Sequence, residues 1–221
     1  MQEYLQPTAI LDCDHPEVVT FARKHATEDG DPRAKAVRLY YAVRDGFRYD
    51  PYNAGAEVES LRASSVLTAG RGWCVSKAVL LSAACRALGI PARLGFADVR
   101  NHLSTERMRR AMKTDVFYYH GYSSIYLDGR WLKATPAFNV ELCEKFRFLP
   151  LEFDGREDSI YHAFDADGRK HMEYIRDHGE FADVPLEDLQ RVFRDKYSAM
   201  DFGLKNAALD FEGDVARETG R

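Results

Sequence analysis

The sequence lacks any long apolar run, and no stretch approaches the roughly 20 apolar residues that a membrane-spanning helix needs. Residues 1–17 lack a basic segment followed by an apolar one, which is the pattern of a secretory signal. Strong charge of one sign is also missing, because 31 Lys and Arg stand against 35 Asp and Glu, giving a net charge of −4 at pH 7. We therefore expect no membrane association and no nucleic-acid partner.

Cysteine is scarce, and its spacing shows no pairing. The four cysteines, Cys13, Cys74, Cys85 and Cys143, form no CxxC motif and have no histidine at zinc-finger distance. We expect neither a disulfide framework nor a metal site, and no pattern indicates a cofactor. Free thiols fit a reducing compartment, so the expected location is cytoplasmic.

What the sequence does contain is ordinary for a globular protein. Its 221 residues are 45% hydrophobic and 30% charged, which is enough for one well-buried core. No segment between the expected elements has the composition of a linker. We predict a single domain over residues 1–199, followed by a charged and loosely ordered tail over residues 200–221.

The ends of several helices can be predicted from capping signals. Asp31–Pro32 is a helix start, and the apolar spacing after it continues to Gly46. A long apolar run over residues 74–88 ends at Gly89, and the proline at position 91 forbids its continuation. Ser104 is expected to cap a short polar helix that ends at Met112. Residues 50–60 are typical of a loop, and residues 185–197 of a helix.

The strands follow the long apolar helix. Residues 92–99 are expected to leave it as one strand, and residues 116–127 form a second strand rich in Tyr, Phe and Ile. Asp128–Gly129 is a strong two-residue hairpin turn into residues 130–134. The order of helices, buried helix and antiparallel strands predicts an α+β fold in which residues 74–88 pack on an antiparallel sheet.

Cys74 is the first candidate for chemistry, because it is expected to begin a helix. Unpaired N–H groups and the positive end of the helix dipole favour a thiolate there. The glycines before it allow a carbonyl to approach the sulfur, and the backbone N–H of Cys74 is a candidate oxyanion donor. A small, buried, inert cysteine would also suit a helix start.

His120 is the second candidate. It lies on the strand that enters the hairpin, and period-two counting places it on one face with Tyr118, Tyr122 and Tyr126. An imidazole on a rigid strand can act as base for a thiol on a helix end. A hydrogen-bonded structural histidine is the alternative interpretation, and a lone cysteine with a distant histidine does not decide between them.

The two segments together resemble the core of the transglutaminase-like superfamily. GWC, ALGIPAR, His120, LDGRW and TPAFN occur in the order and at the spacing of that family, over about residues 35–140. The resemblance implies a papain-like α+β fold, with residues 141–199 as an elaboration that packs on the core or covers the cleft. It also implies Cys74 as nucleophile and His120 as base.

The third catalytic position departs from the family pattern. Thr135 stands where the family has an aspartate, so the resemblance assigns it the role of orienting His120. A hydroxyl can accept the same N–H bond but brings no charge. Asn139 and Asp98 are alternatives for this role, as is Asp115.

Several residues are expected to contact a substrate. Trp73 adjoins the nucleophile and is a candidate wall of the acyl pocket. Tyr49 is a candidate donor to the oxyanion, and Asp98 a candidate for gripping a polar substrate. Three histidines in the C-terminal part, His162, His171 and His178, are too far apart in sequence to share a helix turn, so they do not indicate a metal site.

The expected activity is acyl transfer, or amide or peptide hydrolysis, through a thioester on Cys74. Its substrate would be a protein, a peptide or a small amide. The rival interpretation is a catalytically silent peptide- or protein-binding module, which the Thr135 departure favours. A thiol redox sensor is a third interpretation, but Cys85 lies about three helix turns from Cys74, too far to form a disulfide with it.

Overall fold

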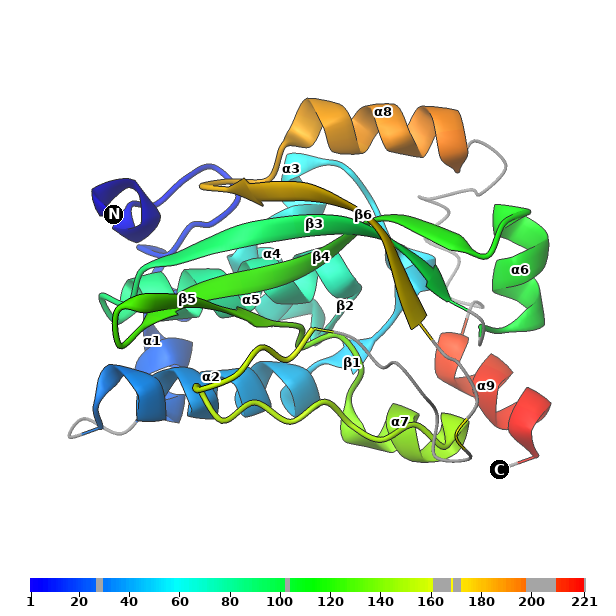
Figure 1. Ribbon diagram of the computed structural model, residues 1–221, viewed down its shortest axis with the longest axis horizontal. Coiled ribbons are helices and arrows are strands. Elements are labelled where there is room, and N and C mark those ends of the chain that lie inside the picture. Colours follow the sequence, from blue (N-terminus) through cyan, green and yellow to red (C-terminus); the bar gives the residue numbers. More distant parts are fainter. Residues whose placement is uncertain (27–29, 102–103, 161–167, 169–171, 198–209, 221) are drawn as a thin grey trace.

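A computed structural model describes residues 1–26, 30–101, 104–160, 168, 172–197 and 210–220 (Figure 1). Among these residues, no helix is both long and apolar enough to cross a membrane. The helices outside the sheet are η1 (Gln2–Leu5), α1 (Pro16–His25), α2 (Pro32–Gly46), η2 (Pro51–Asn53), α3 (Val58–Leu61), α4 (Ala63–Ala69), α5 (Cys74–Ala87), α6 (Glu106–Met112), α7 (Val140–Phe146), α8 (Leu186–Lys196) and α9 (Phe211–Thr219).

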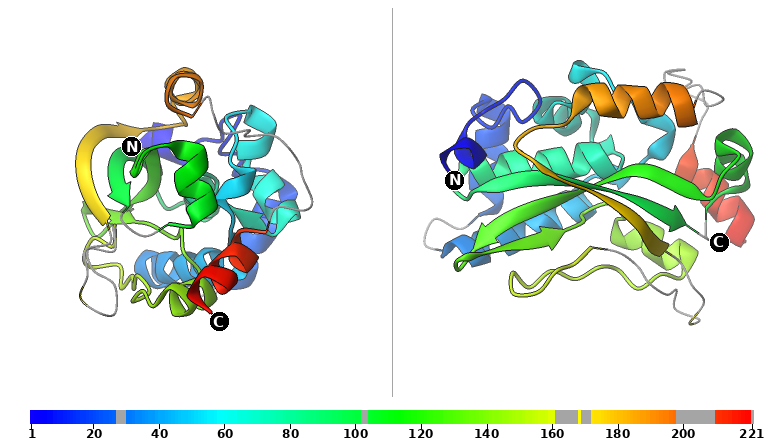
Figure 2. Two further views of the ribbon diagram at one scale, coloured as in Figure 1. Left: turned by 90° about the vertical axis from the view of Figure 1, so that its right-hand side faces the viewer. Right: turned by 45° about the horizontal axis from the view of Figure 1, so that its top comes forward.

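The four-stranded sheet is antiparallel. Its order is β5-β4-β3-β6, with bounds β3 (Ala92–Asn101), β4 (Val116–Leu127), β5 (Arg130–Ala134) and β6 (Met172–Phe181). The expected hairpin joins β4 and β5, and Asp128 and Gly129 both have positive φ, at 48° and 84°. These angles are the left-handed pair that a two-residue hairpin requires. The sheet curls, and α8 lies along one edge of it (Figure 2).

Helix α5 lies at the centre of the fold. It packs on β3 and β4 and also contacts α1, α2 and α4. Every residue from Cys74 to Arg86 is therefore buried, which explains an apolar run without a polar face. The α+β fold with this helix on an antiparallel sheet is confirmed.

Two buried cations fix α5 to its surroundings. The Lys77 ammonium donates to the carbonyls of Arg44, Phe47 and Ala137 at 2.6–2.8 Å. Near the other end of α5, the Arg86 guanidinium donates to the carbonyls of Ala92, Gln6 and Ala182. Each cation satisfies carbonyls from segments far apart in sequence, so both hold α5 in place.

A short parallel pair, β1 (Arg48–Tyr49) and β2 (Arg71–Gly72), leads into α5. Tyr49 pairs with Gly72 in this ladder. The pairing sets Tyr49 beside the residues that begin α5. Because β1 follows α2 directly, the C-terminal end of α2 is tied to the start of α5.

The structure corrects several expectations. Residues 50–60 contain η2 and most of α3, and the cap of α6 is Thr105, whose hydroxyl accepts from the Met108 N–H, not Ser104. Residues 211–219, predicted as part of a loose tail, form α9, which contacts α7 and buries Phe211 and Val215. The rest of that segment, residues 200–209 and 221, lies outside the described residues.

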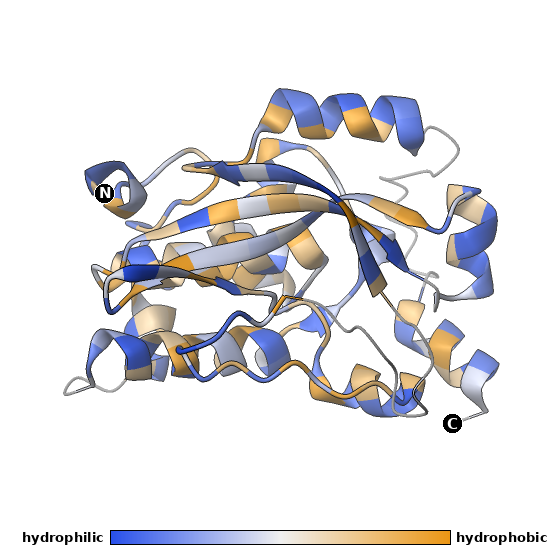
Figure 3. Cartoon of the chain, viewed as in Figure 1, coloured by the Kyte–Doolittle hydropathy of each residue, from blue (hydrophilic) through white to orange (hydrophobic). Residues whose placement is uncertain are grey.

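Helix α8 covers one side of the sheet. Its apolar positions lie towards the sheet and its charged positions face outward (Figure 3). Leu189 is fully buried, and Val192 and Phe193 pack against the core. This amphipathic pattern agrees with the helix expected over residues 185–197.

Candidate active site

Cys74 is the first residue of α5, as the sequence predicts. The turn before it is tight, because the backbone N–H of Trp73 donates to the Ser76 hydroxyl at 3.0 Å. A Cβ on Gly72 would come within 2.5 Å of that hydroxyl. Glycine therefore lets the chain enter the helix at this angle, and the sulfur sits over the first turn of α5.

Strand β4 passes directly over the start of α5. A Cβ on Gly121 would lie 2.9 Å from the Cα of Val75, so only glycine allows this approach. The preceding residue, His120, is buried, at 3% exposure. His120 and Cys74 line one cavity, although they are far apart in sequence.

The alternation of side chains between the two faces of β4 is interrupted just before His120. Tyr119 has a positive φ of 55°, and the ladder between β3 and β4 shifts register between Ala97 and Val99. A bulge of this kind re-aims the side chains beside it. The period-two argument therefore does not hold between Tyr118 and His120, although both line the same cavity, while the ladder from His120 to Tyr122 is regular.

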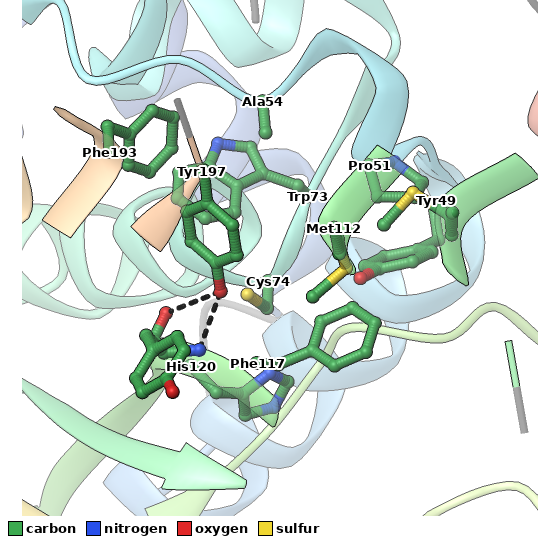
Figure 4. Close-up of a pocket in the computed structure, with 12 residues that line it drawn as sticks. Tyr49, Pro51, Ala54, Trp73, Cys74, Met112, Phe117, His120, Phe193 and Tyr197 are labelled. Carbon is green, nitrogen blue, oxygen red and sulfur yellow. Dashed lines mark hydrogen bonds between the residues drawn. The ribbon is translucent and has the colours of Figure 1, made fainter. Parts of the chain in front are cut away.

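The cavity beside Cys74 is small, with a volume of about 30 Å³. That is room for one or two water molecules. The described residues that line it are Tyr49, Pro51, Ala54, Trp73, Cys74, Met108, Met112, Phe117, Tyr118, His120, Phe193 and Tyr197 (Figure 4). Trp73 and Tyr49 are among these residues, and their expected contacts with a substrate stay predictions.

Burial is the largest influence on the pKa of the Cys74 thiol. It raises the pKa of Cys74 to about 11, although the backbone N–H groups of Gly121, Val75 and Cys74 itself hydrogen-bond the sulfur and lower it. The desolvation of a thiolate outweighs the helix end and these donors. The helix start and its N–H donors favour the thiolate, as the sequence predicts, but burial opposes them more strongly and favours the protonated thiol.

Two tyrosines flank the thiol. Burial is the main cause that raises the pKa of Tyr49 and of Tyr197, and a charge on Cys74 would raise both further. Both phenols are therefore neutral. A neutral phenol near a reacting carbonyl can donate a hydrogen bond to an oxyanion, the role that the sequence suggests for Tyr49.

Tyr197 and Phe193 cover the cavity from α8. The Tyr197 hydroxyl accepts from the Tyr118 N–H at 2.6 Å and donates to the Tyr118 carbonyl at 3.4 Å, and in Figure 4 it lies beside the Cys74 thiol. The Trp73 and Phe193 rings meet edge to face, with centroids 5.6 Å apart. Cys74 is left 4% exposed, so a substrate carbonyl needs this cover to move.

Thr135 does not line the cavity, and its hydroxyl donates to the carbonyl of Ile160 at 2.9 Å. Asn139 is also engaged elsewhere, because its side-chain oxygen accepts from the Tyr49 N–H at 3.0 Å and its amide donates to Glu141. Each of these bonds goes to a group other than His120. The assignment of Thr135 or Asn139 as the orienting residue therefore stays a prediction.

Asp98 also lies outside the cavity lining, and its expected contact with a substrate stays a prediction. Its carboxylate accepts from the Tyr119 N–H at 3.1 Å and pairs with the His178 ring at 2.8 Å. The His178 ring stacks on Tyr119, with centroids 4.2 Å apart. Asp98 therefore holds the strained residue next to His120. His162 and His171 lie outside the described residues.

Metal ligation is not indicated where the structure is described, since no three His, Cys, Asp or Glu side chains gather there at ligand distance. All four cysteines are buried and free. The wall residues that sequence reasoning missed are Pro51, Ala54, Met108, Met112, Phe117, Phe193 and Tyr197. Apolar and tyrosine side chains of this kind have no motif, so only the tertiary contacts reveal them.

Comparison with known proteins agrees with this architecture. The model of the transglutaminase-like superfamily core matches residues 19–136, more than half of the chain. The chain therefore belongs to the transglutaminase-like superfamily. The match begins before the motifs that carry the sequence resemblance, and so includes α2 and part of α1.

Two solved structures are similar at low identity. A "putative cysteine protease" from Cytophaga hutchinsonii is 16% identical with a TM-score of 0.47, over 80% of this chain and 53% of that one. A "putative protease" from Parabacteroides distasonis is 17% identical with a TM-score of 0.38, over 57% of this chain and 25% of that one. The chain thus spans about half and a quarter of those proteins. No curated protein matches this chain.

Proposed function

We propose that this protein is a cysteine-nucleophile enzyme that transfers or hydrolyses an acyl group through a thioester on Cys74, with His120 as its base. The observation that carries the proposal is that a cysteine at a helix start and a histidine from β4 line one cavity. Membership of the superfamily supports the same pair. A peptide, protein or small amide is the substrate, and a reducing compartment such as the cytoplasm keeps the thiol free.

The chemistry follows from the environment of the thiol. Because burial holds Cys74 protonated, a base must take its proton as the sulfur attacks the carbonyl. His120 takes that proton, the C–S bond forms, and the carbonyl oxygen becomes an oxyanion. Three N–H groups hydrogen-bond the sulfur, those of Gly121, Val75 and Cys74, and we propose that those of Gly121 and Cys74 also stabilise that oxygen.

The thioester then forms as the leaving group departs with the proton that His120 returns. Water or an amine next attacks the thioester carbonyl, and His120 accepts the proton of the attacking group. The C–S bond breaks, and the proton goes back to the Cys74 sulfur. Hydrolysis and amine transfer differ only in this second nucleophile.

Hydrolysis of an activated ester such as p-nitrophenyl acetate tests the proposal. Cys74→Ala and His120→Ala should each lower the rate by at least about 100-fold, within the range lost when a nucleophile or its base is removed. Cys85→Ala is the matched control, because that cysteine lies on the same helix, is fully buried and is outside the cavity. A rate that depends on Cys85 and not on Cys74 would refute the proposal.

A silent binding module is the second candidate, and one specific observation favours it. The Thr135 hydroxyl donates its proton to the Ile160 carbonyl. It could therefore orient His120 only by accepting a second hydrogen bond, from the imidazole ring. Such a module would still be expected to bind a peptide. If the protein is such a module, the wild type should hydrolyse the ester no faster than Cys74→Ala does. Both proteins should then bind the same peptide.

A further inference from the structure

The walls of the cavity beside Cys74 are almost wholly apolar. Apart from Cys74, His120 and the tyrosines, the described lining residues are aromatic or aliphatic, and none of them is Asp, Glu, Lys or Arg. A charged group placed here would lose its water and meet no opposite charge, and an amide would meet only the tyrosine hydroxyls, Cys74 and His120. The cavity therefore selects against polar groups next to the reacting carbonyl.

A second cavity, of about 20 Å³, lies beside the first. The two share four wall residues, Tyr49, Pro51, Met108 and Phe117. Further back the wall is built from phenylalanines, and its described polar side chains are those of Tyr49, Asn101 and Ser104. The two cavities share apolar walls, and we call them, with the side chains between them, the apolar path, which begins at the thiol and lies between η2 and α6.

Two methionines form the side of this path that can adapt. Met108 and Met112 are the buried residues of α6, a helix of only two turns. Methionine is unbranched and polarisable, so it fits groups of different shape and makes favourable contacts with aromatic rings. A short helix with this lining can yield to a side chain that the closed cavity does not yet hold.

We propose that the acyl group delivered to Cys74 carries an uncharged, apolar side chain, which enters this path between η2 and α6. The inference rests on the proposed function, because it names the substrate class of the same site. It distinguishes the enzyme from one that acts on glutamine or on acidic residues. Leucine, methionine and aromatic acyl groups match the chemistry of these walls, and the Met-lined side of α6 must yield to admit them.

Three cysteine-directed probes test the inference on the wild-type chain. N-acetyl acyloxymethyl ketones of Leu, Asn and Asp differ in polarity but have nearly the same size. In each, the Cys74 sulfur displaces the carboxylate leaving group from the methylene carbon, so a C–S bond forms, a C–O bond breaks and His120 takes the thiol proton. The rate of labelling is measured by intact mass, and peptide mapping identifies the modified cysteine.

The Leu probe should label Cys74 at least about tenfold faster than the Asn and Asp probes, because an unpaired polar group resists burial. Equal labelling of Cys74 by the three probes would overturn the inference and leave the nucleophile intact. Labelling by iodoacetamide but by none of the ketones would also overturn it, since the path would then admit no side chain. The proposed function itself fails if Cys74 reacts with none of these reagents.

A matched pair of variants tests whether the cavity wall causes the preference for the Leu probe. Met112→Gln puts an amide into the wall and should lower the ratio of Leu to Asn labelling at least about threefold. Met172→Gln is the control, because Met172 is equally buried but lines neither cavity. An unchanged ratio in a folded Met112→Gln protein, shown by its melting curve, would contradict the path. The wild-type probe series stands as a test if that variant does not fold.

Discussion

Gly121→Ala should damage the candidate site through a single methyl group. The added Cβ would lie 2.9 Å from the Val75 Cα, 3.0 Å from its Cγ2 and 3.3 Å from its Cβ. The first of these contacts is to backbone, which cannot rotate away, so β4 must move off the start of α5. His120 precedes the substituted residue and moves with the strand.

The cost can be worked from these contacts. Overpacking of this kind costs about 1–3 kcal/mol, and the loss of glycine's freedom in the unfolded chain returns about 0.5–1 kcal/mol. A net loss of about 0.5–2 kcal/mol lowers the melting temperature by about 1–8 °C in a chain of this size. Activity should fall further, by at least about tenfold, because small displacements of catalytic groups are costly.

The assay is a thermal melt together with hydrolysis of p-nitrophenyl acetate by the folded variant. Gly46→Ala is the matched control, since a Cβ there meets nothing within 4 Å. It should leave activity unchanged. If Gly121→Ala has the melting temperature and the hydrolysis rate of the wild type, the close approach of β4 to α5 does not position His120.

Three further outcomes are expected. Since burial raises the pKa of Cys74 to about 11, its alkylation by iodoacetamide should increase about tenfold per pH unit from pH 7 to 10, and a plateau by pH 7 would contradict the buried, protonated thiol. Tyr197→Phe removes the hydroxyl that hydrogen-bonds the Tyr118 backbone. Alkylation of Cys74 at pH 8 should therefore rise several-fold, and the free energy of unfolding should fall by about 1–3 kcal/mol. Asp98→Ala leaves the Tyr119 N–H without its acceptor and should slow ester hydrolysis and lower the melting temperature, whereas Asp98→Asn, which keeps an acceptor, should recover most of both losses.

Local signals were enough to predict the centre of the fold. The start of α5 at Cys74 and the hairpin at Asp128–Gly129 depend on glycines and on one apolar run, which act within a few residues. Both therefore appear in the sequence. The superfamily resemblance adds the pairing of Cys74 with His120, which is a long-range relation that no local pattern contains.

The edges of the fold could not be predicted in this way. Strand β6 is an edge strand with a mostly exposed or half-buried pattern, so it has no clear alternation of polar and apolar residues. Helix α9 is short, and its only apolar anchors described as buried are Phe211 and Val215. Its position depends on tertiary contacts such as the bond from the Tyr52 hydroxyl to Asp214.

The pKa of the Cys74 thiol could not be predicted from the sequence, for a related reason. A helix start lowers a thiol pKa, but deep burial can outweigh that effect, and depth of burial is a property of the folded chain. The residues that bury Cys74 most directly, Tyr197 and Phe193, come from α8 and its end, more than a hundred positions along the chain. Nothing near Cys74 in the sequence indicates them.

The most direct test of the central claim is to trap the acyl-enzyme. The protein is mixed with an activated ester, quenched in acid, digested and analysed by mass spectrometry in the wild-type, His120→Ala and Cys85→Ala forms. We predict a thioester on Cys74 in the wild type and in Cys85→Ala, formed at least about 100-fold more slowly in His120→Ala. An acyl group on another residue, or one that forms on Cys74 at the same rate without His120, would contradict the account.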